Sequence, residues 1–285
     1  MKNSEGLTRR HFVRNGLMAS AFLSACGQPA GAAGLLGSRS PDRGLKLGIT
    51  TYTLRKFSLD QAIAMTQEAG LKYISLKEMH LPLKSSREER IAARDKVKAA
   101  GLVLTGGGVI YLKNDEQEIN NAFEYAKDAG MPTITCSPEP EALDKVETFA
   151  KQFNIRIAIH NHGPGDKRYP SALDVLRLIE NRDRLMGICI DVGHTVRNGE
   201  NPVSVIEQCA ARLHDFHMKD VTAATAKGES IEVGKGVIDI PGVLKALLRA
   251  KFKYNVALEY EAHADDPMPG VKASIQYIRG LLKDS

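Results

Sequence analysis

From Leu45 onward, the sequence alternates short runs of apolar and β-branched residues with amphipathic segments of helical period. Strands are predicted at residues 45–51, 73–77, 102–105, 133–136, 155–159, 186–191, 212–218 and 254–259. Helices are predicted at residues 58–70, 86–101, 115–130, 141–153, 171–181, 202–211, 240–250 and 269–282. Eight consecutive strand–helix pairs predict an α/β protein with a single (β/α)8 TIM barrel over residues 45–285.

An open, doubly wound sheet is the main alternative to the barrel. Such a sheet usually carries a glycine fingerprint that turns directly into a helix. The three glycines at 106–108 lead instead into Val109, Ile110 and Tyr111, so a phosphate-binding loop is not expected there. We therefore expect that these glycines, which have no side chains, leave the rim of the barrel mouth low, so that a substrate can approach the backbone there.

Four predicted strands end in residues whose side chains can bind a metal ion or transfer a proton. Their ends hold His160, then Asp191 with His194, then His217, and finally Glu259. In α/β barrels the carboxyl ends of the strands meet at one mouth, and active sites lie there. Imidazoles and carboxylates together suit a borderline or hard divalent cation. The sequence therefore predicts a divalent metal site inside a barrel.

Composition excludes several other classes of protein. The 285 residues are 43% hydrophobic and 26% charged, which is an ordinary globular balance. The formal net charge of +5 is too weak and too dispersed for a nucleic-acid-binding surface, so no nucleic-acid partner is expected. The four cysteines show no zinc-ribbon spacing, and we expect Cys136, Cys189 and Cys209 to be buried free thiols.

The first 33 residues have the pattern of a twin-arginine export signal. Arg9 and Arg10 precede an apolar stretch that is too short to span a bilayer as a permanent helix. The run ending in Cys26 resembles a lipobox, in which that cysteine would carry a lipid anchor. Cleavage among residues 30–33 is the alternative, and residues 34–44 read as a flexible linker. We expect a periplasmic protein, either released or anchored as a lipoprotein.

From Leu45 to its end, the chain resembles the xylose isomerase-like TIM barrel superfamily of sugar phosphate isomerases and epimerases. The resemblance rests on pieces whose order and spacing are specific only together: His160-Asn161-His162, Asp191-Val192-Gly193-His194, Phe216-His217-Met218-Lys219-Asp220, Gly234-Lys235-Gly236-Val237-Ile238-Asp239 and Leu258-Glu259.

The resemblance implies a bound Mn²⁺, Mg²⁺, Co²⁺ or Zn²⁺ ion. Asp191, His217 and Glu259 match three of the family's ligands, and His194 matches its substrate-contacting histidine. Many of the family's epimerases have a glutamate at the fourth position, where this chain has His160. We expect His160 to complete the ligand set.

The resemblance also implies chemistry through an enediolate, and the expected catalytic residues are Glu259, His194 and His160. A metal-dependent isomerase or epimerase of a free or oxidised sugar is the first expectation. Because His160 replaces a glutamate, only Glu259 remains as a liganding carboxylate base. One-base elimination by a lyase or hydratase on a 3-keto-sugar or glycoside is therefore the second expectation. A sugar-binding barrel without turnover is the third.

Several further residues are candidates for contact with a small carbohydrate substrate. Each also has an ordinary interpretation, either as a packed histidine or as a solvated charge. The candidates are Tyr52, Lys77, His80, His162, His194, Lys219 and Lys235, with Glu261 as a further rim residue. The sequence leaves open which sugar is bound and whether the protein forms a homo-oligomer.

The export signal gives a first prediction. Replacing Arg9 and Arg10 with lysine should leave the protein in the cytoplasm, because the twin-arginine pair is the recognised feature. Cys26→Ala should release a lipid-anchored protein from membranes. Cell fractionation and immunoblotting measure both effects, and a wild-type protein found wholly in the soluble fraction would exclude the anchor.

Overall fold

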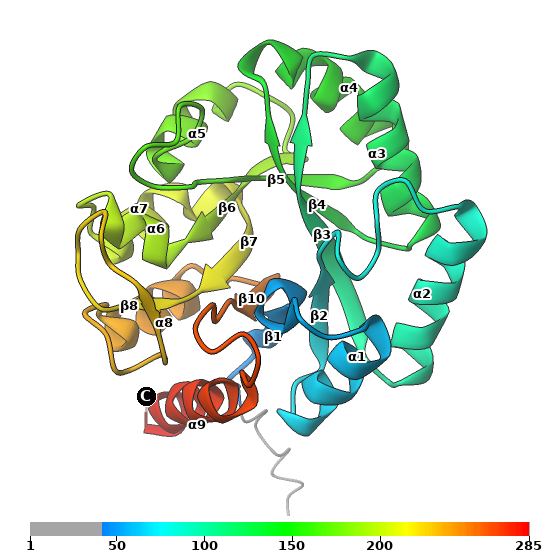
Figure 1. The fold of residues 1–285 in the computed structure, drawn as a ribbon. Helices are drawn as coiled ribbons and strands as arrows, with labels where there is room; N and C mark the ends of the chain where they lie inside the picture. Colours follow the sequence, from blue (N-terminus) through cyan, green and yellow to red (C-terminus); the bar gives the residue numbers. More distant parts are fainter. Residues whose placement is uncertain (1–41, 285) are drawn as a thin grey trace, which may run out of the picture. The chain divides into compact units, whose positions relative to one another are not determined.

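The computed structural model describes residues 42–284. Within that range eight parallel strands form a closed barrel in the order β1-β10-β7-β6-β5-β4-β3-β2, and helices surround it (Figure 1). The predicted TIM barrel is confirmed. The predicted signal segment, Cys26 and most of the predicted linker lie outside the described residues.

The elements have the following bounds. The barrel strands are β1 (Lys46–Thr50), β2 (Tyr73–Leu76), β3 (Val103–Leu112), β4 (Thr133–Pro138), β5 (Arg156–His160), β6 (Met186–Asp191), β7 (Leu213–Met218) and β10 (Asn255–Leu258). The α-helices are α1 (Leu59–Glu68), α2 (Arg87–Ala99), α3 (Glu116–Asp128), α4 (Leu143–Phe153), α5 (Ala172–Ile179), α6 (Val192–Arg197), α7 (Pro202–Cys209), α8 (Ile240–Arg249) and α9 (Met268–Asp284). Short 3-10 turns lie at Thr51–Leu54, Pro140–Ala142 and Ala210–Arg212, and β8 (Asp220–Val221) pairs with β9 (Ser230–Ile231) outside the barrel.

Helix starts follow the sequence signals closely. Ser58 caps α1, and its hydroxyl accepts from the Gln61 N–H while the Gln61 side chain accepts from the Ser58 N–H. Ser86 and Glu89 form the same reciprocal pair at the start of α2. Each pair satisfies backbone donors that a helix leaves unbonded at its first turn. The predicted N-cap at Ser58 is confirmed.

Strand β3 is longer than predicted, and the role expected for its glycines is wrong. The strand continues through Gly106–Gly108 to Leu112. A Cβ on Gly106 would lie 2.7 Å from the Thr133 carbonyl oxygen, and one on Gly108 would lie 1.9 Å from that of Thr135. The glycines therefore allow β3 to approach β4, and the rim begins only beyond them.

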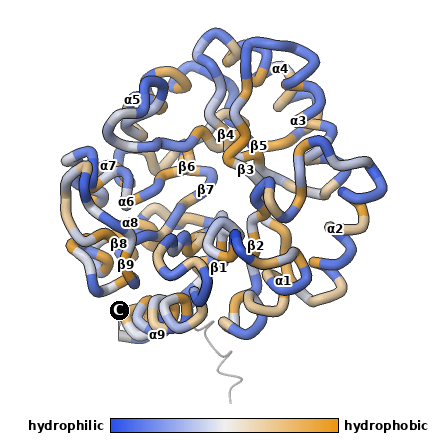
Figure 2. The backbone as a smooth tube through the Cα atoms, viewed as in Figure 1, coloured by the Kyte–Doolittle hydropathy of each residue, from blue (hydrophilic) through white to orange (hydrophobic). Residues whose placement is uncertain are grey.

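Apolar side chains fill the space between the barrel and its helices. Figure 2 shows hydrophobic residues along the central strands and hydrophilic residues over the outer loops. Cys136, Cys189 and Cys209 are buried and free, as predicted. Among the described residues, no helix is long and apolar enough to cross a membrane.

Asp220 organises the long loop between β7 and α8. Its side chain is fully buried and accepts four backbone N–H groups. Its Oδ2 accepts from Gly234 and Gly236, and its Oδ1 accepts from Val221 and Ile238. One carboxylate therefore satisfies backbone donors of residues 234–238, which lie beyond the short β8–β9 ladder of this loop.

Replacing Asp220 with alanine should strongly destabilise the protein. An unsatisfied buried N–H costs about 1–3 kcal/mol, so the loss of several acceptors should lower the free energy of unfolding by at least about 3 kcal/mol. Urea denaturation followed by circular dichroism measures the change. Asp266→Ala is the control, because Asp266 is exposed and should tolerate the change. Equal stability of the two variants would contradict this role for Asp220.

Candidate metal and substrate site

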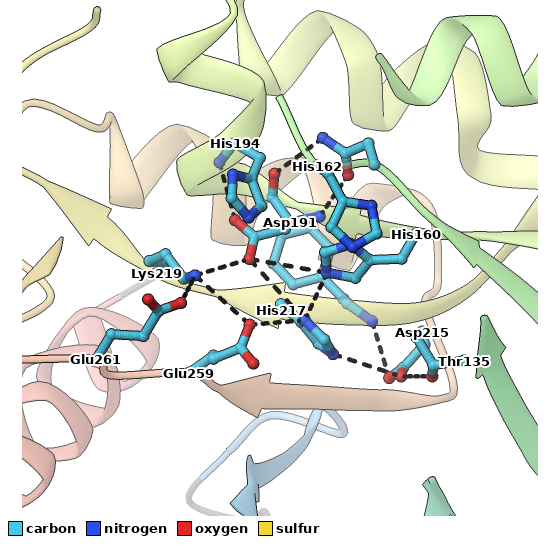
Figure 3. A network of polar contacts seen from close by, with 12 residues as sticks. Thr135, His160, His162, Asp191, His194, Asp215, His217, Lys219, Glu259 and Glu261 are labelled. Carbon is cyan, nitrogen blue, oxygen red and sulfur yellow. Dashed lines mark hydrogen bonds and ion pairs between the residues drawn. The ribbon is translucent and has the colours of Figure 1, made fainter. Parts of the chain in front are cut away.

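Four consecutive strands of the barrel bring the predicted ligands together. β5, β6 and β7 end at or near His160, Asp191 and His217, and Glu259 directly follows β10. The β6–β7 register pairs Asp191 with His217, and the Glu259 N–H donates to the Met218 carbonyl oxygen of β7. All four side chains are buried and converge at the carboxyl ends of the strands (Figure 3).

The donor atoms of these four residues are close enough to hold one ion. One donor atom from each residue can be chosen so that all lie within 4.8 Å of one another. His160 Nε2 lies 3.0 Å from His217 Nδ1, which lies 3.0 Å from Glu259 Oε2. Asp191 Oδ2 lies 4.0 Å from His160 Nε2 and 3.9 Å from His217 Nδ1.

Asp191 is held in place by its neighbours. Its N–H donates to Asn161 Oδ1, and its Oδ1 accepts from the His194 N–H. Asp191 therefore caps α6, a short helix that is not among the helices predicted from the sequence. Its other oxygen, Oδ2, is buried, faces both imidazoles and forms an ion pair with Lys219.

Two lysines balance the buried carboxylates. Lys219 Nζ lies 3.1 Å from Asp191 Oδ2 and 3.5 Å from Glu259 Oε2, and it also pairs with Glu261. Lys77 Nζ lies 3.2 Å from Glu259 Oε1. These contacts reduce the cost of burying negative charge at the barrel mouth.

The charges of the site are set by burial and by these neighbours. Burial, and then the imidazole of His217, lowers the pKa of His160 well below its ordinary value. Burial alone would raise the pKa of Glu259, but Lys77 and His217 outweigh it and hold that pKa well below its usual range. At neutral pH the site therefore offers an uncharged His160 and an ionised Glu259.

The residues fit a divalent cation. Two imidazole nitrogens 3.0 Å apart, beside two buried carboxylates, form a donor set of nitrogen and oxygen atoms. Neutral histidine and ionised carboxylate are the protonation states that metal binding requires. Asp191 Oδ2 is a buried anionic oxygen that already faces a cationic group, the ammonium of Lys219, and it could bind a metal cation instead. Borderline ions such as Zn²⁺, Co²⁺ and Mn²⁺ suit such a set.

A cavity of about 380 Å³ opens above this cluster. Its size lies within the range of small-molecule sites. It is lined by Tyr52, Lys77, Glu78, Met79, Val109, Tyr111, His160, His162, His194, Glu259 and Glu261. A ligand in this cavity would therefore touch Glu259 and three imidazoles.

The predicted substrate residues divide into three groups. Tyr52, Lys77, His162 and His194 line the cavity, as does the rim candidate Glu261. Lys219 is buried among the carboxylates and is not part of the lining.

The third group comprises His80 and Lys235, which lie away from this cavity. His80 Nε2 lies 3.1 Å from the Phe57 carbonyl oxygen, and its side chain lines a different cavity beside α1 and α2. The Lys235 side chain is 62% exposed and pairs with Glu232. The geometry gives no support to the substrate roles predicted for these two residues.

The apolar part of the cavity wall was not predicted from the sequence. Met79 and Tyr111 line it, and Tyr111 is 62% exposed despite its size. The Tyr111 hydroxyl lies 3.3 Å from His162 Nε2, and the two rings stack with centroids 5.9 Å apart. An aromatic residue at the carboxyl end of a barrel strand was the available signal, but the predicted third strand ended too early to place Tyr111 there.

The family assignment follows from comparison with known proteins. The model of the xylose isomerase-like TIM barrel family matches residues 63–281. The chain therefore belongs to this family, as the sequence resemblance predicted.

Named relatives within this fold catalyse different reactions. An inosose dehydratase from Clostridium botulinum (strain Eklund 17B / Type B) is 27% identical over 69% of this chain and 68% of its own length. Matches to two further clostridial inosose dehydratases span 45% and 48% of those proteins.

Among solved structures, a protein from Parabacteroides distasonis ATCC 8503 is 27% identical with a TM-score of 0.65, over 82% of this chain and 98% of that one. A 3-keto-D-glucoside 4-epimerase from E. coli is 16% identical with a TM-score of 0.68, over 83% of this chain and 99% of that one, which shows a shared fold.

Removing the charge of Lys219 should strengthen metal binding. Its ammonium group lies against the oxygens that would hold the ion, and like charges a few ångströms apart repel. Lys219→Met should therefore raise the affinity for Mn²⁺ by at least about tenfold in calorimetric titration. Lys235→Met removes an exposed lysine outside the cavity and should leave the affinity unchanged. A weaker affinity in Lys219→Met would show that Lys219 supports the ion's ligands rather than competing with the ion.

Proposed function

We propose that this protein is a divalent-metal-dependent lyase that eliminates a β-hydroxyl or β-alkoxyl group from a keto-sugar. The observation that best supports this proposal is that one carboxylate, Glu259, both belongs to the ligand set and lines the cavity. His160 belongs to both as well, but it offers an imidazole where many related epimerases have a second glutamate. The similarity to inosose dehydratases, at 27% identity for the one from C. botulinum, supports an elimination.

Glu259 is the proton acceptor in this mechanism. It is ionised at neutral pH, and it faces the cavity beside Lys77. Its carboxylate removes the proton next to the substrate carbonyl, and the C–O bond at the β carbon then breaks. The same carboxyl group returns the proton to the departing oxygen, so water or an alcohol leaves and the carboxylate is regenerated.

The surrounding charges favour the negative charge that develops on the substrate. A divalent ion held by His160, Asp191, His217 and Glu259 would polarise the substrate carbonyl. Lys77 lines the cavity, and the buried Lys219 lies next to the same carboxylates. Burial and the charges of Asp191 and Glu259 act in opposite directions on Lys219, and the carboxylates prevail and raise its pKa. Lys219 therefore stays cationic throughout the reaction.

An isomerase or epimerase is the second candidate, and the histidines of the cavity favour it. His162 and His194 follow β5 and β6, whereas Glu259 follows β10. Burial lowers the pKa of both histidines, so they are uncharged and could exchange a proton with a second face of the substrate. Export of the protein, as its first residues predict, would favour free sugars or glycosides over phosphorylated sugars.

The apolar wall gives the substrate a surface to stack on. We infer that Tyr111 and Tyr52 contact the C–H faces of a sugar ring, because aromatic rings combine a large apolar area with a polar tip.

Glu259→Gln tests the proposed base. The loss of a positioned base costs about 10²–10⁴ in rate, so turnover of a 3-keto-glycoside should fall by at least about 10² even at saturating Mn²⁺. Glu261→Gln is the matched control, because Glu261 lines the same cavity but is not part of the ligand set, and it should lose far less activity. Wild-type turnover in Glu259→Gln would exclude Glu259 as the base.

Product analysis in deuterated water separates the candidate functions. A lyase gives an unsaturated product and a released alcohol or water, which nuclear magnetic resonance identifies. An epimerase gives a new stereoisomer carrying deuterium at the inverted carbon. Binding of metal and sugar without any exchange of a C–H proton would instead indicate a non-catalytic sugar-binding barrel.

A further inference from the structure

Cys189 lies one inward-facing position deeper in the barrel than Asp191. It precedes Asp191 by two residues on β6, so both side chains point to the same face of the strand. The β5–β6 register pairs Cys189 with His160, whereas the β6–β7 register pairs Asp191 with His217. Cys189 is fully buried beneath the mouth of the barrel.

This cysteine forms a second ligand set with the same two histidines. Cys189 Sγ, one nitrogen of His160 and one nitrogen of His217 lie within 4.8 Å of one another. The other set combines the two imidazoles with Asp191 and Glu259. The two sets share both histidines and differ in their remaining donors, which are sulfur in one and oxygen in the other.

The chemistry of these donors distinguishes between metals. Thiolate sulfur favours thiophilic ions such as Zn²⁺ and Cd²⁺, whereas carboxylate oxygen suits Mg²⁺ and Mn²⁺. We propose that the barrel holds two mutually exclusive metal positions. The outer position uses His160, His217, Asp191 and Glu259, and the inner position uses His160, His217 and Cys189 for a thiophilic ion.

The inner position would inhibit the proposed chemistry. His160 and Glu259 line the substrate cavity, but Cys189 does not. An ion drawn toward Cys189 takes both imidazoles from the outer position and lies away from the cavity. Binding converts the thiol to a thiolate, and its proton leaves to solvent. Cd²⁺ bound at the inner position should therefore displace Mn²⁺ and block turnover.

Cd²⁺ titration of the full-length protein tests the inner position directly. A cadmium–thiolate bond gives a charge-transfer absorption in the ultraviolet that bonds to oxygen and nitrogen lack. The test variant is Cys189→Ser, and the control is Cys136→Ser, which removes a buried cysteine that belongs to neither ligand set. Any contribution from Cys26 is the same in both variants, so their difference isolates Cys189.

We expect the absorption to appear in wild type and Cys136→Ser and to disappear in Cys189→Ser. Cd²⁺ affinity should fall at least about tenfold in Cys189→Ser, the smallest loss typical of removing a group that supports a metal site. Mn²⁺ affinity should be unchanged, which also reports that the barrel is folded. Mn²⁺ should compete with Cd²⁺ in wild type.

Three results would overturn the proposal: an undiminished absorption in Cys189→Ser, equal Cd²⁺ affinity in the two variants, or simultaneous binding of Mn²⁺ and Cd²⁺. Cys189→Ala repeats the comparison if serine disturbs the barrel. The proposal uses histidines that the proposed function also uses, but these measurements need no substrate. A failed lyase assay would therefore leave the result on Cys189 intact.

Discussion

Closure of the parallel barrel is the constraint on which the site depends. Pairing of β1 with β10 completes the ring, and β10 lies beside β7, which adjoins β6 and then β5. Glu259 therefore meets His160 although the two residues are far apart in the chain. Parallel strands place all of their carboxyl ends at one mouth, so the ligand set follows from strand order rather than from any local motif.

This arrangement buries several charged side chains close to one another. Asp191 and Glu259 lie in the barrel mouth, where isolated carboxylates would be costly. Lys77 and Lys219 offset that cost; Lys77 follows β2, and Lys219 follows the ligand-bearing strand β7. The backbone contributes as well, because the His194 N–H bonds one oxygen of Asp191, while the other oxygen pairs with Lys219 and faces the imidazoles.

Strand ends could be predicted from the sequence, but loops could not. Asp191 and His217 each lie at or near the end of a segment with the residue pattern of a strand. Their position at the barrel mouth therefore follows from the predicted strands. His80 and Lys235 lie in loops, where the direction of a side chain depends on packing that periodicity does not encode. Tyr111 was missed for a related reason. Glycines usually end strands, but close packing of β3 against β4 carries the strand past them.

The buried lysines also bear on how the protein matures. In many small metal-binding domains the ligands repel one another until the ion arrives, so the chain cannot fold without it. Here Lys219 pairs with both carboxylates, and the hydrophobic layer around the barrel is formed by other residues. Charge repulsion between the two carboxylates therefore does not oppose folding of the barrel. An ion at the proposed site would therefore bind a barrel that is already folded, and it would have to displace Lys219 from the carboxylates.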